Sequence, residues 1–144
     1  MVPEPRPALL VSACLLGTCC NHEGRHSKRA AVEALAAEYR LVPICPEVAG
    51  GLPTPRAAAE ICGDAVVNAD GDDVTVEYRR GAQAAVELAA AVDARRAVLK
   101  ARSPSCGAHQ VYDGTFTRTL RDGEGITAAA LRAAGLEVRS EEEL

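Results

Sequence analysis

The sequence predicts a single-domain α/β protein: a mostly parallel, four-stranded sheet with helices on both faces, a Rossmann-like three-layer arrangement into which a small β-hairpin is inserted. Two observations carry this prediction. Short apolar segments alternate along the chain with longer segments of helical periodicity. In addition, 48% of the residues are hydrophobic but only 3% are aromatic, so aliphatic side chains and alanine must build the core.

The expected strands are short and continuously apolar. Residues 8–13 (ALLVSA) are hydrophobic almost throughout, as a strand buried on both faces would be. Three more strands are expected at residues 41–44, 97–99 and 136–138, the first of these weakened by Pro43.

Three helices are expected between these strands. Residues 27–39 start at Ser27, a good N-cap, and place alanine and leucine on one helical face. Residues 81–94 are rich in alanine, and residues 125–134 begin with a glycine. This order of strands and helices is typical of a parallel sheet covered by helices.

One segment interrupts the alternation. Residues 63–78 contain two valine-rich pieces on either side of ADGD at residues 69–72, a pattern that predicts a hairpin. No repeat, low-complexity tract or linker divides the chain. The length of 144 residues therefore predicts one domain, 1–144.

Charge and hydropathy exclude several kinds of partner. The net charge is −4, which argues against nucleic acid as the main partner. No apolar run reaches the about 20 residues of a membrane helix, and no signal-peptide pattern opens the chain. We therefore expect a cytoplasmic protein that does not bind a membrane. Three glutamates at residues 141–143 form an acidic tail with no evident partner.

Six cysteines in such a chain indicate metal binding or catalysis rather than a disulfide framework. Cys14, Cys45 and Cys106 each follow a predicted strand. The carboxyl ends of parallel strands meet at one edge of a sheet, so these three thiols are expected to converge. Glycines and prolines around them allow the backbone to approach a bulky group. The set favours a soft-metal centre, either iron–sulfur or zinc.

The other cysteines are less informative. Cys62 is interpreted as structural. Cys19 and Cys20 are adjacent, so their side chains are expected to diverge, and Cys20 is a candidate fourth ligand or a reactive thiol near the site. No Cys-x-x-Cys pair is present, which disfavours a zinc ribbon or a thioredoxin-like motif.

Four blocks of sequence, in this order, resemble the domain-of-unknown-function family 523 (DUF523), which includes the thiouracil desulfidases. The blocks are VSACLLGTCC, PICPEVAGGLPTPR, KARSPSCG and VYDGTF, followed by DGEGITAAALRAAGLEV. The resemblance extends over residues 9–144. It implies a [4Fe-4S] cluster bound by Cys14, Cys45 and Cys106, with one iron free of protein ligands.

The resemblance also implies a reaction. A small-molecule thiolated nucleobase, such as a thiouracil-like pyrimidine, would bind the open iron through its sulfur. Water would replace that sulfur, and sulfide would leave without net redox change, with the iron acting as a Lewis acid. Glu47, two residues after Cys45, is the candidate general acid or base. Ser103 and Ser105, beside Cys106, are candidate hydrogen-bond donors to the substrate or to cluster sulfur.

One loop departs from the family pattern. The family commonly has Arg-Tyr-Asp-Gly after the position of Cys20, whereas residues 21–24 read Asn-His-Glu-Gly. This change bears on the exact substrate. His22 in this loop is a candidate proton carrier.

The residues by themselves are also compatible with other classes of function. One is a zinc- or cluster-binding module with a purely structural site, in which Cys20 would complete four ligands. Another is a metal-free enzyme with Cys14 or Cys106 as the nucleophile, which requires a base nearby. A sulfur-relay protein would need an exposed cysteine that forms a persulfide. The number of protein ligands to the metal distinguishes the enzyme from the structural module.

Overall fold

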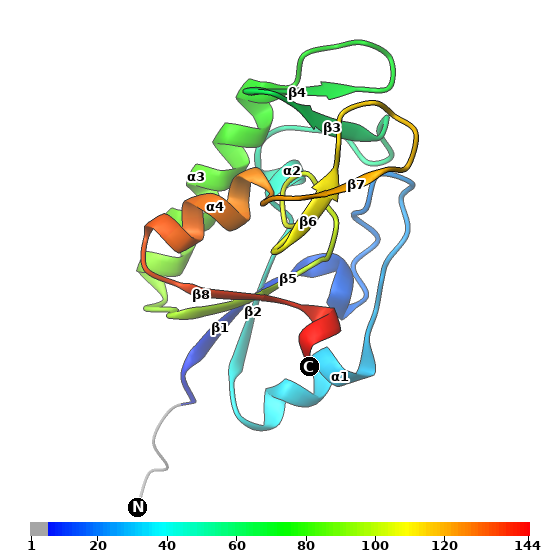
Figure 1. Ribbon diagram of the computed structural model, residues 1–144. Helices are drawn as coiled ribbons and strands as arrows, with labels where there is room; N and C mark the ends of the chain where they lie inside the picture. The colour runs from blue at the N-terminus through cyan, green and yellow to red at the C-terminus, as the bar shows by residue number, and fades with distance from the viewer. Residues whose placement is uncertain (1–5) are drawn as a thin grey trace, which may run out of the picture.

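The computed structural model describes residues 6–144, and a parallel four-stranded sheet lies at its centre (Figure 1). The strand order is β2-β1-β5-β8. The strands are β1 (Ala8–Ser12), β2 (Arg40–Ile44), β5 (Arg96–Leu99) and β8 (Glu137–Ser140). All five residues of β1 are buried, because this strand lies between two others and both of its faces are covered. The predicted parallel sheet is confirmed.

Helices cover both faces of the sheet, as predicted. They are α1 (Ala30–Glu33), which continues as the 3-10 turn η2 (Ala34–Ala37), α2 (Pro46–Ala49), α3 (Thr75–Ala91) and α4 (Ile126–Ala133). Two more 3-10 turns are η1 (Ala13–Leu16) and η3 (Glu141–Glu143). Helices α3 and α4 pack together on one face, around Leu10, Leu99 and Leu131 (Figure 1). On the other face, Val32 packs with Val11. Within residues 6–144, no helix is long and apolar enough to cross a membrane.

Two antiparallel hairpins extend from this framework. They are β3 (Ala59–Cys62) with β4 (Ala65–Asn68), and β6 (Gln110–Tyr112) with β7 (Leu120–Asp122). The first is the expected insertion, but its predicted extent, residues 63–78, was wrong. Its turn lies at Gly63, and residues from Thr75 onward belong to α3. Sequence analysis did not predict the second hairpin.

The expected helix at residues 27–39 is also shorter than predicted. The backbone N–H of Ser27 donates to Cys14 O at 2.8 Å, and that of Arg29 donates to Leu15 O at 3.0 Å. These bonds tie the segment to η1 in an extended form, so the helix begins only at Ala30. Ser27 is therefore not an N-cap.

Candidate active site

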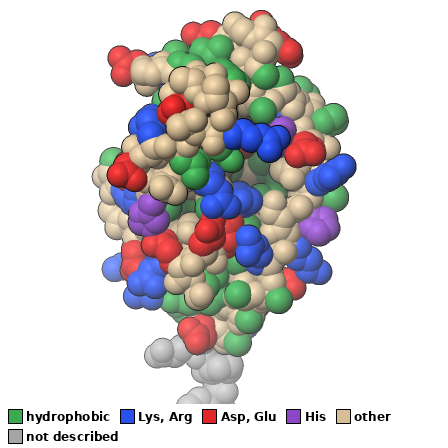
Figure 2. All heavy atoms as spheres, turned by 45° about the vertical axis from the view of Figure 1, so that its right-hand side comes forward, with side chains coloured by type: hydrophobic (Ala, Val, Ile, Leu, Met, Phe, Trp, Pro, Cys, Tyr) green, Lys and Arg blue, Asp and Glu red, His purple; other side chains and the backbone are tan. Residues whose placement is uncertain are grey.

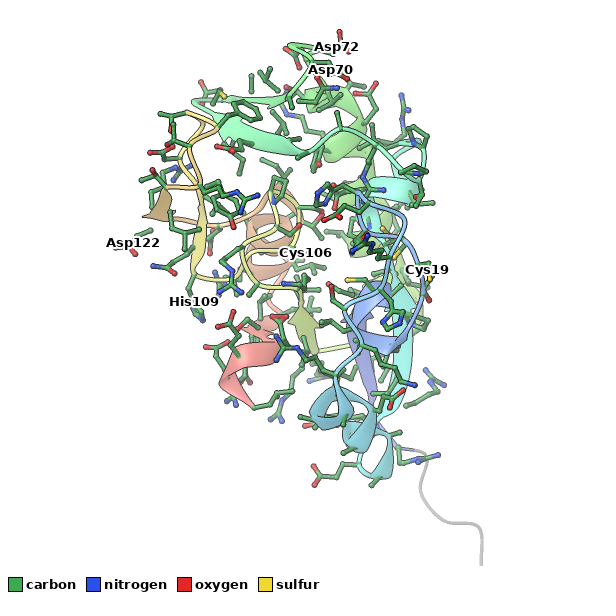
Figure 3. The ribbon with its side chains drawn as sticks, turned by 90° about the vertical axis from the view of Figure 1, so that its right-hand side faces the viewer. Cys19, Asp70, Asp72, Cys106, His109 and Asp122 are labelled. Carbon is green, nitrogen blue, oxygen red and sulfur yellow. The ribbon has the colours of Figure 1, made fainter. Side chains whose placement is uncertain are left out.

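Three cysteines from three strand ends line one cavity of about 620 Å³. Cys14 lies in η1, directly after β1, and Cys45 lies between β2 and α2. Cys106 lies in the loop after β5 and is 3% exposed. In Figure 3, Cys106 is near the centre of the view, whereas Cys19 lies toward the right-hand edge. The parallel sheet thus brings together thiols that are far apart in the sequence.

Cys20 also lines this cavity, and its backbone carbonyl accepts a hydrogen bond from Cys45 Sγ at 3.6 Å. Interaction with the Cys14 thiol, together with burial, raises the pKa of Cys20 to about 11. Contact with Cys20 and burial raise the pKa of Cys45, and burial raises that of Cys106 to about 12. Without a metal these thiols are neutral at pH 7; bound metal ions favour their thiolate forms.

Hydroxyl groups surround Cys106. The Ser103 Oγ atom lines the cavity and accepts the backbone N–H groups of Ser105 at 3.1 Å and Cys106 at 3.0 Å. Ser105 is fully buried, and its hydroxyl bonds to Thr127 Oγ1 at 2.8 Å. Interaction with the hydroxyls of Ser12 and Ser105 partly offsets the effect of burial on the pKa of the Cys106 thiol. Ser103 therefore faces the cavity, whereas Ser105 lies behind the cysteine.

Glu47 lies in the first turn of α2 and points into the same cavity. Its Oε2 atom accepts a hydrogen bond from the Tyr78 hydroxyl. Its Oε1 atom lies 3.4 Å from Arg56 Nη2, which also donates to Cys20 O at 2.9 Å. The two side chains of this ion pair are 6% exposed for the arginine and 15% for the glutamate. Although burial opposes it, the Glu47 charge raises the pKa of Arg56. Burial and the same carboxylate raise the pKa of Tyr78.

Two glycines determine how closely α2 approaches α3. A Cβ atom on Gly50 would lie 2.0 Å from Glu77 O, and one on Gly81 would lie 2.0 Å from Pro46 O. Only glycine fits at both positions, so the two backbones touch. This contact places the turn that carries Glu47 beside Tyr78.

The β6–β7 hairpin forms another part of the cavity wall. Tyr112 and Phe116 line the cavity there, and Arg118 follows them. The buried Glu60 Oε1 atom accepts the backbone N–H groups of Gly114 at 3.0 Å and Phe116 at 3.2 Å, which holds the loop over the cavity. Figure 2 shows basic side chains gathered across the middle of this side of the molecule.

The other residues singled out in the sequence lie as follows. His22 lines the cavity, and Cys19 is exposed. Cys62 lies outside the cavity, and its Sγ donates to Gly114 O at 3.5 Å. Sequence analysis missed several lining residues, which are Ser12, Arg56, Tyr78, Lys100, Tyr112 and Phe116. Arg56 belongs to the family-like block PICPEVAGGLPTPR, which was a usable signal.

The fold and the site define an α/β protein with a thiol-rich cavity at the carboxyl end of its sheet. Residues 9–143 match the model of the 2-thiouracil desulfurase family, and the chain belongs to this family. It is similar to the solved structure named [4Fe-4S]-dependent thiouracil desulfidase TudS (DUF523Vcz), with 46% identity and a TM-score of 0.91. That match covers 96% of this chain and 93% of the other. The resemblance to DUF523 is confirmed.

A second relative is the uncharacterized protein YbbK of Bacillus subtilis (strain 168), which is 40% identical over 146 residues. The match covers 94% of this chain and 97% of the relative. Both matches cover more than nine tenths of this chain, and the residues matched by the family, 9–143, include the whole site.

The residues present fit a [4Fe-4S] cluster in their chemistry. Thiolates are the ligands of such clusters, and three buried or half-buried thiols from separate strand ends face one cavity. In the part of the chain that the structure describes, no group of three or more His, Cys, Asp or Glu side chains is arranged around one metal ion. A cluster is wider than one ion and takes ligands that lie further apart.

Proposed function

We propose that this protein is a [4Fe-4S]-dependent desulfidase that releases hydrogen sulfide from 2-thiouracil or a related small thiolated nucleobase. The observation that carries the proposal is the convergence of Cys14, Cys45 and Cys106 on one cavity in a chain of the 2-thiouracil desulfurase family. When bound by these three thiolates, the cluster supplies an iron with an open coordination position, a Lewis acid that polarises the carbon–sulfur bond.

The overall reaction exchanges sulfur for oxygen without oxidation or reduction. A thiocarbonyl group and one water molecule give a carbonyl group and hydrogen sulfide. Two protons move from the water oxygen to the departing sulfur. A group in the cavity must therefore accept a proton and later return it.

We assign this proton transfer to Glu47. Its carboxylate faces the cavity, and Arg56 and Tyr78 bind its two oxygens, which holds the group in one orientation. The fixed carboxylate accepts a proton from the attacking water and donates it to the sulfur. Positioned carboxylates of this kind contribute about 10²–10⁴-fold to a rate.

The two serines have different roles in this proposal. Ser103 Oγ already accepts two backbone N–H groups, so its own hydrogen is free to donate to the substrate. Ser105 directly precedes Cys106 and is fully buried, and its bond to Thr127 fixes the backbone next to this ligand. The aromatic rings of Tyr112 and Phe116 offer flat surfaces to a planar pyrimidine.

The proposal includes the setting in which the protein works. We infer that residues 1–144 act as one domain in the cytoplasm, where reducing conditions keep thiols free of disulfides. All six cysteines are unpaired in the structure. The substrate is a small molecule, and neither nucleic acid nor a membrane is the main partner.

Anaerobic purification with measurement of iron, zinc and acid-labile sulfide tests the proposal. Wild type should bind about four iron and four sulfide per chain. The Cys14→Ser, Cys45→Ser and Cys106→Ser variants should lose them, whereas the Cys62→Ser control keeps them. Wild type should then release hydrogen sulfide from 2-thiouracil, and Glu47→Gln should do so at least about 100-fold more slowly.

Two results would contradict the proposal. One zinc ion without sulfide would indicate a structural metal module. Absence of any metal after anaerobic reconstitution would favour a cysteine nucleophile. Cys20→Ser distinguishes a cluster with three protein ligands from one with Cys20 as the fourth ligand. A cluster that survives in this variant needs only three protein ligands, as an open iron requires.

A further inference from the structure

The three glutamates of η3, for which the sequence indicates no evident partner, form ion pairs within the fold. Strands β5 and β8 are parallel, with Leu99 opposite Ser140, so the segments that leave them lie side by side. The first of these segments, residues 100–109, carries Ser103, Ser105 and Cys106, and we name it the cysteine loop.

Each glutamate contacts the cysteine loop. Glu141 Oε1 accepts the backbone N–H of Ala101 at 2.7 Å, and its Oε2 lies 3.7 Å from Lys100 Nζ. Glu142 Oε1 lies 2.6 Å from Arg102 Nη1, and Glu143 Oε1 lies 2.5 Å from His109 Nε2. The contacts therefore hold both ends of the loop, and Figure 3 shows His109 beside the C-terminal segment.

Glu141 differs from its two neighbours in burial. Its side chain is fully buried, whereas those of Glu142 and Glu143 are 45% and 35% exposed. Exposed ion pairs contribute little, but a buried carboxylate bound to a backbone N–H forms a strong, charge-assisted bond. Glu141 Oε2 has no hydrogen-bond partner among the described residues, so the nearby Lys100 ammonium is what compensates its charge.

The bonds of Glu141 fall where the loop enters the cavity. Lys100, Ala101, Arg102 and Ser103 all line the cavity, and Ser103 in turn binds the backbone of Cys106. Arg102 has a φ of +64°, a left-handed conformation that is costly for a residue with a side chain. Contacts on both sides are needed to maintain such a turn.

We propose that Glu141 is a positioning residue for the active site: it holds the start of the cysteine loop so that Ser103 and Cys106 face the cavity. The C-terminal glutamates are thus part of the site's support, although no atom of η3 lines the cavity. The inference rests on the proposed function, because that function makes the cavity an active site. Its central test needs neither a cluster nor activity.

That test is alkylation of the metal-free, reduced protein, followed cysteine by cysteine by mass spectrometry. In Glu141→Ala, Cys106 should react about tenfold faster than in wild type, because loss of a charge-assisted bond favours local opening of the loop. Cys14 and Cys45, on other strands, should keep their wild-type rates. Equal acceleration of all three thiols would indicate general destabilisation and overturn the proposal, as would an unchanged rate at Cys106.

Two further variants sharpen the result. Glu141→Gln keeps an oxygen that can accept the Ala101 N–H, so it should restore the slow rate at Cys106 to within about twofold of wild type. Glu137→Ala is the matched control: this glutamate lies on β8, four residues before Glu141, and pairs with Arg96 and Arg139 at the surface. If Glu137→Ala accelerates Cys106 as much as Glu141→Ala does, the proposal fails.

The iron retained by the reconstituted protein distinguishes failure of this inference from failure of the proposed function. When all variants are reconstituted and passed through gel filtration in the same way, Glu141→Ala should retain at most about half the iron of wild type. Glu141→Gln should retain most of it. If wild type binds no cluster while the alkylation pattern holds, the proposed function fails and the role of Glu141 in the loop stands. If wild type binds the cluster, and Glu141→Ala retains it fully and shows unchanged alkylation, the positioning role of Glu141 fails and the proposed function stands.

Discussion

The close contact between α2 and α3 makes Gly81→Ala an informative substitution. The new Cβ atom would lie 2.0 Å from Pro46 O and 2.7 Å from Pro46 C, so the two backbones would have to separate by about 1 Å. In an unobstructed helix, alanine is preferred over glycine by about 1 kcal/mol. Overpacking costs about 1–3 kcal/mol. We expect the substitution to lower the free energy of unfolding by at most about 2 kcal/mol, the overpacking cost less the helix preference for alanine.

The effect on activity should be larger than the effect on stability. Pro46 lies between Cys45 and Glu47, so a displaced α2 moves a thiol and the carboxylate together. A shift of about 1 Å in catalytic geometry costs about 100-fold in rate. Gly81→Ala should therefore lower kcat for sulfide release from 2-thiouracil by about that factor, in anaerobically reconstituted protein.

Gln83→Ala is the matched control, because this residue is exposed on the same helix and its side chain bonds to Glu87 of that helix. Denaturant unfolding and sulfide release should be measured on both variants. If Gly81→Ala is as stable and as active as Gln83→Ala, the backbone contact does not position the site and the reasoning is refuted.

Three other predictions follow from the described contacts. Tyr78→Phe removes the hydroxyl that binds Glu47 and should lower kcat about tenfold at unchanged iron content; equal kcat would contradict the role of that bond. Hydrogen bonds from a hydroxyl and an N–H hold the pKa of Asp73 below its usual value, so its contribution to stability is present above about pH 4 and is lost as pH falls through the lowered value. Asp73→Asn should therefore lessen the difference in stability between pH 7 and pH 3, measured by denaturant unfolding, and an unchanged difference would count against this. In metal-free protein, exposed Cys19 should be alkylated first and Cys106, which is only 3% exposed, last; mass spectrometry would reveal any other order.

The central sheet and the meeting of the cysteines followed from local sequence patterns. The apolar run in β1 has the length and composition of a strand buried on both faces. Once that strand and its parallel neighbours are assigned, the thiols that follow them must share an edge. Cys14, Cys45 and Cys106 lie where this argument predicted.

The features that were missed depend on contacts between distant segments. Residues 27–29 are kept out of a helix by backbone bonds to η1, which no local pattern reveals. Val74 to Tyr78 alternates like a strand, yet it enters α3 because Tyr78 packs inward against Glu47. The β6–β7 hairpin has a fully exposed strand, Leu120–Asp122, and so shows no hydrophobic alternation.

Because aromatic residues are scarce, tyrosine fluorescence can report on the cavity. The chain has no tryptophan and three tyrosines, and two of these, Tyr78 and Tyr112, line the cavity. The third, Tyr39, accepts a hydrogen bond from Arg96 at the opposite end of the sheet. Two of the three tyrosines that can emit in the ultraviolet therefore lie in the walls of the cavity. An absorbing group bound there would quench that emission, so the unmodified chain reports by its own fluorescence when the cavity fills.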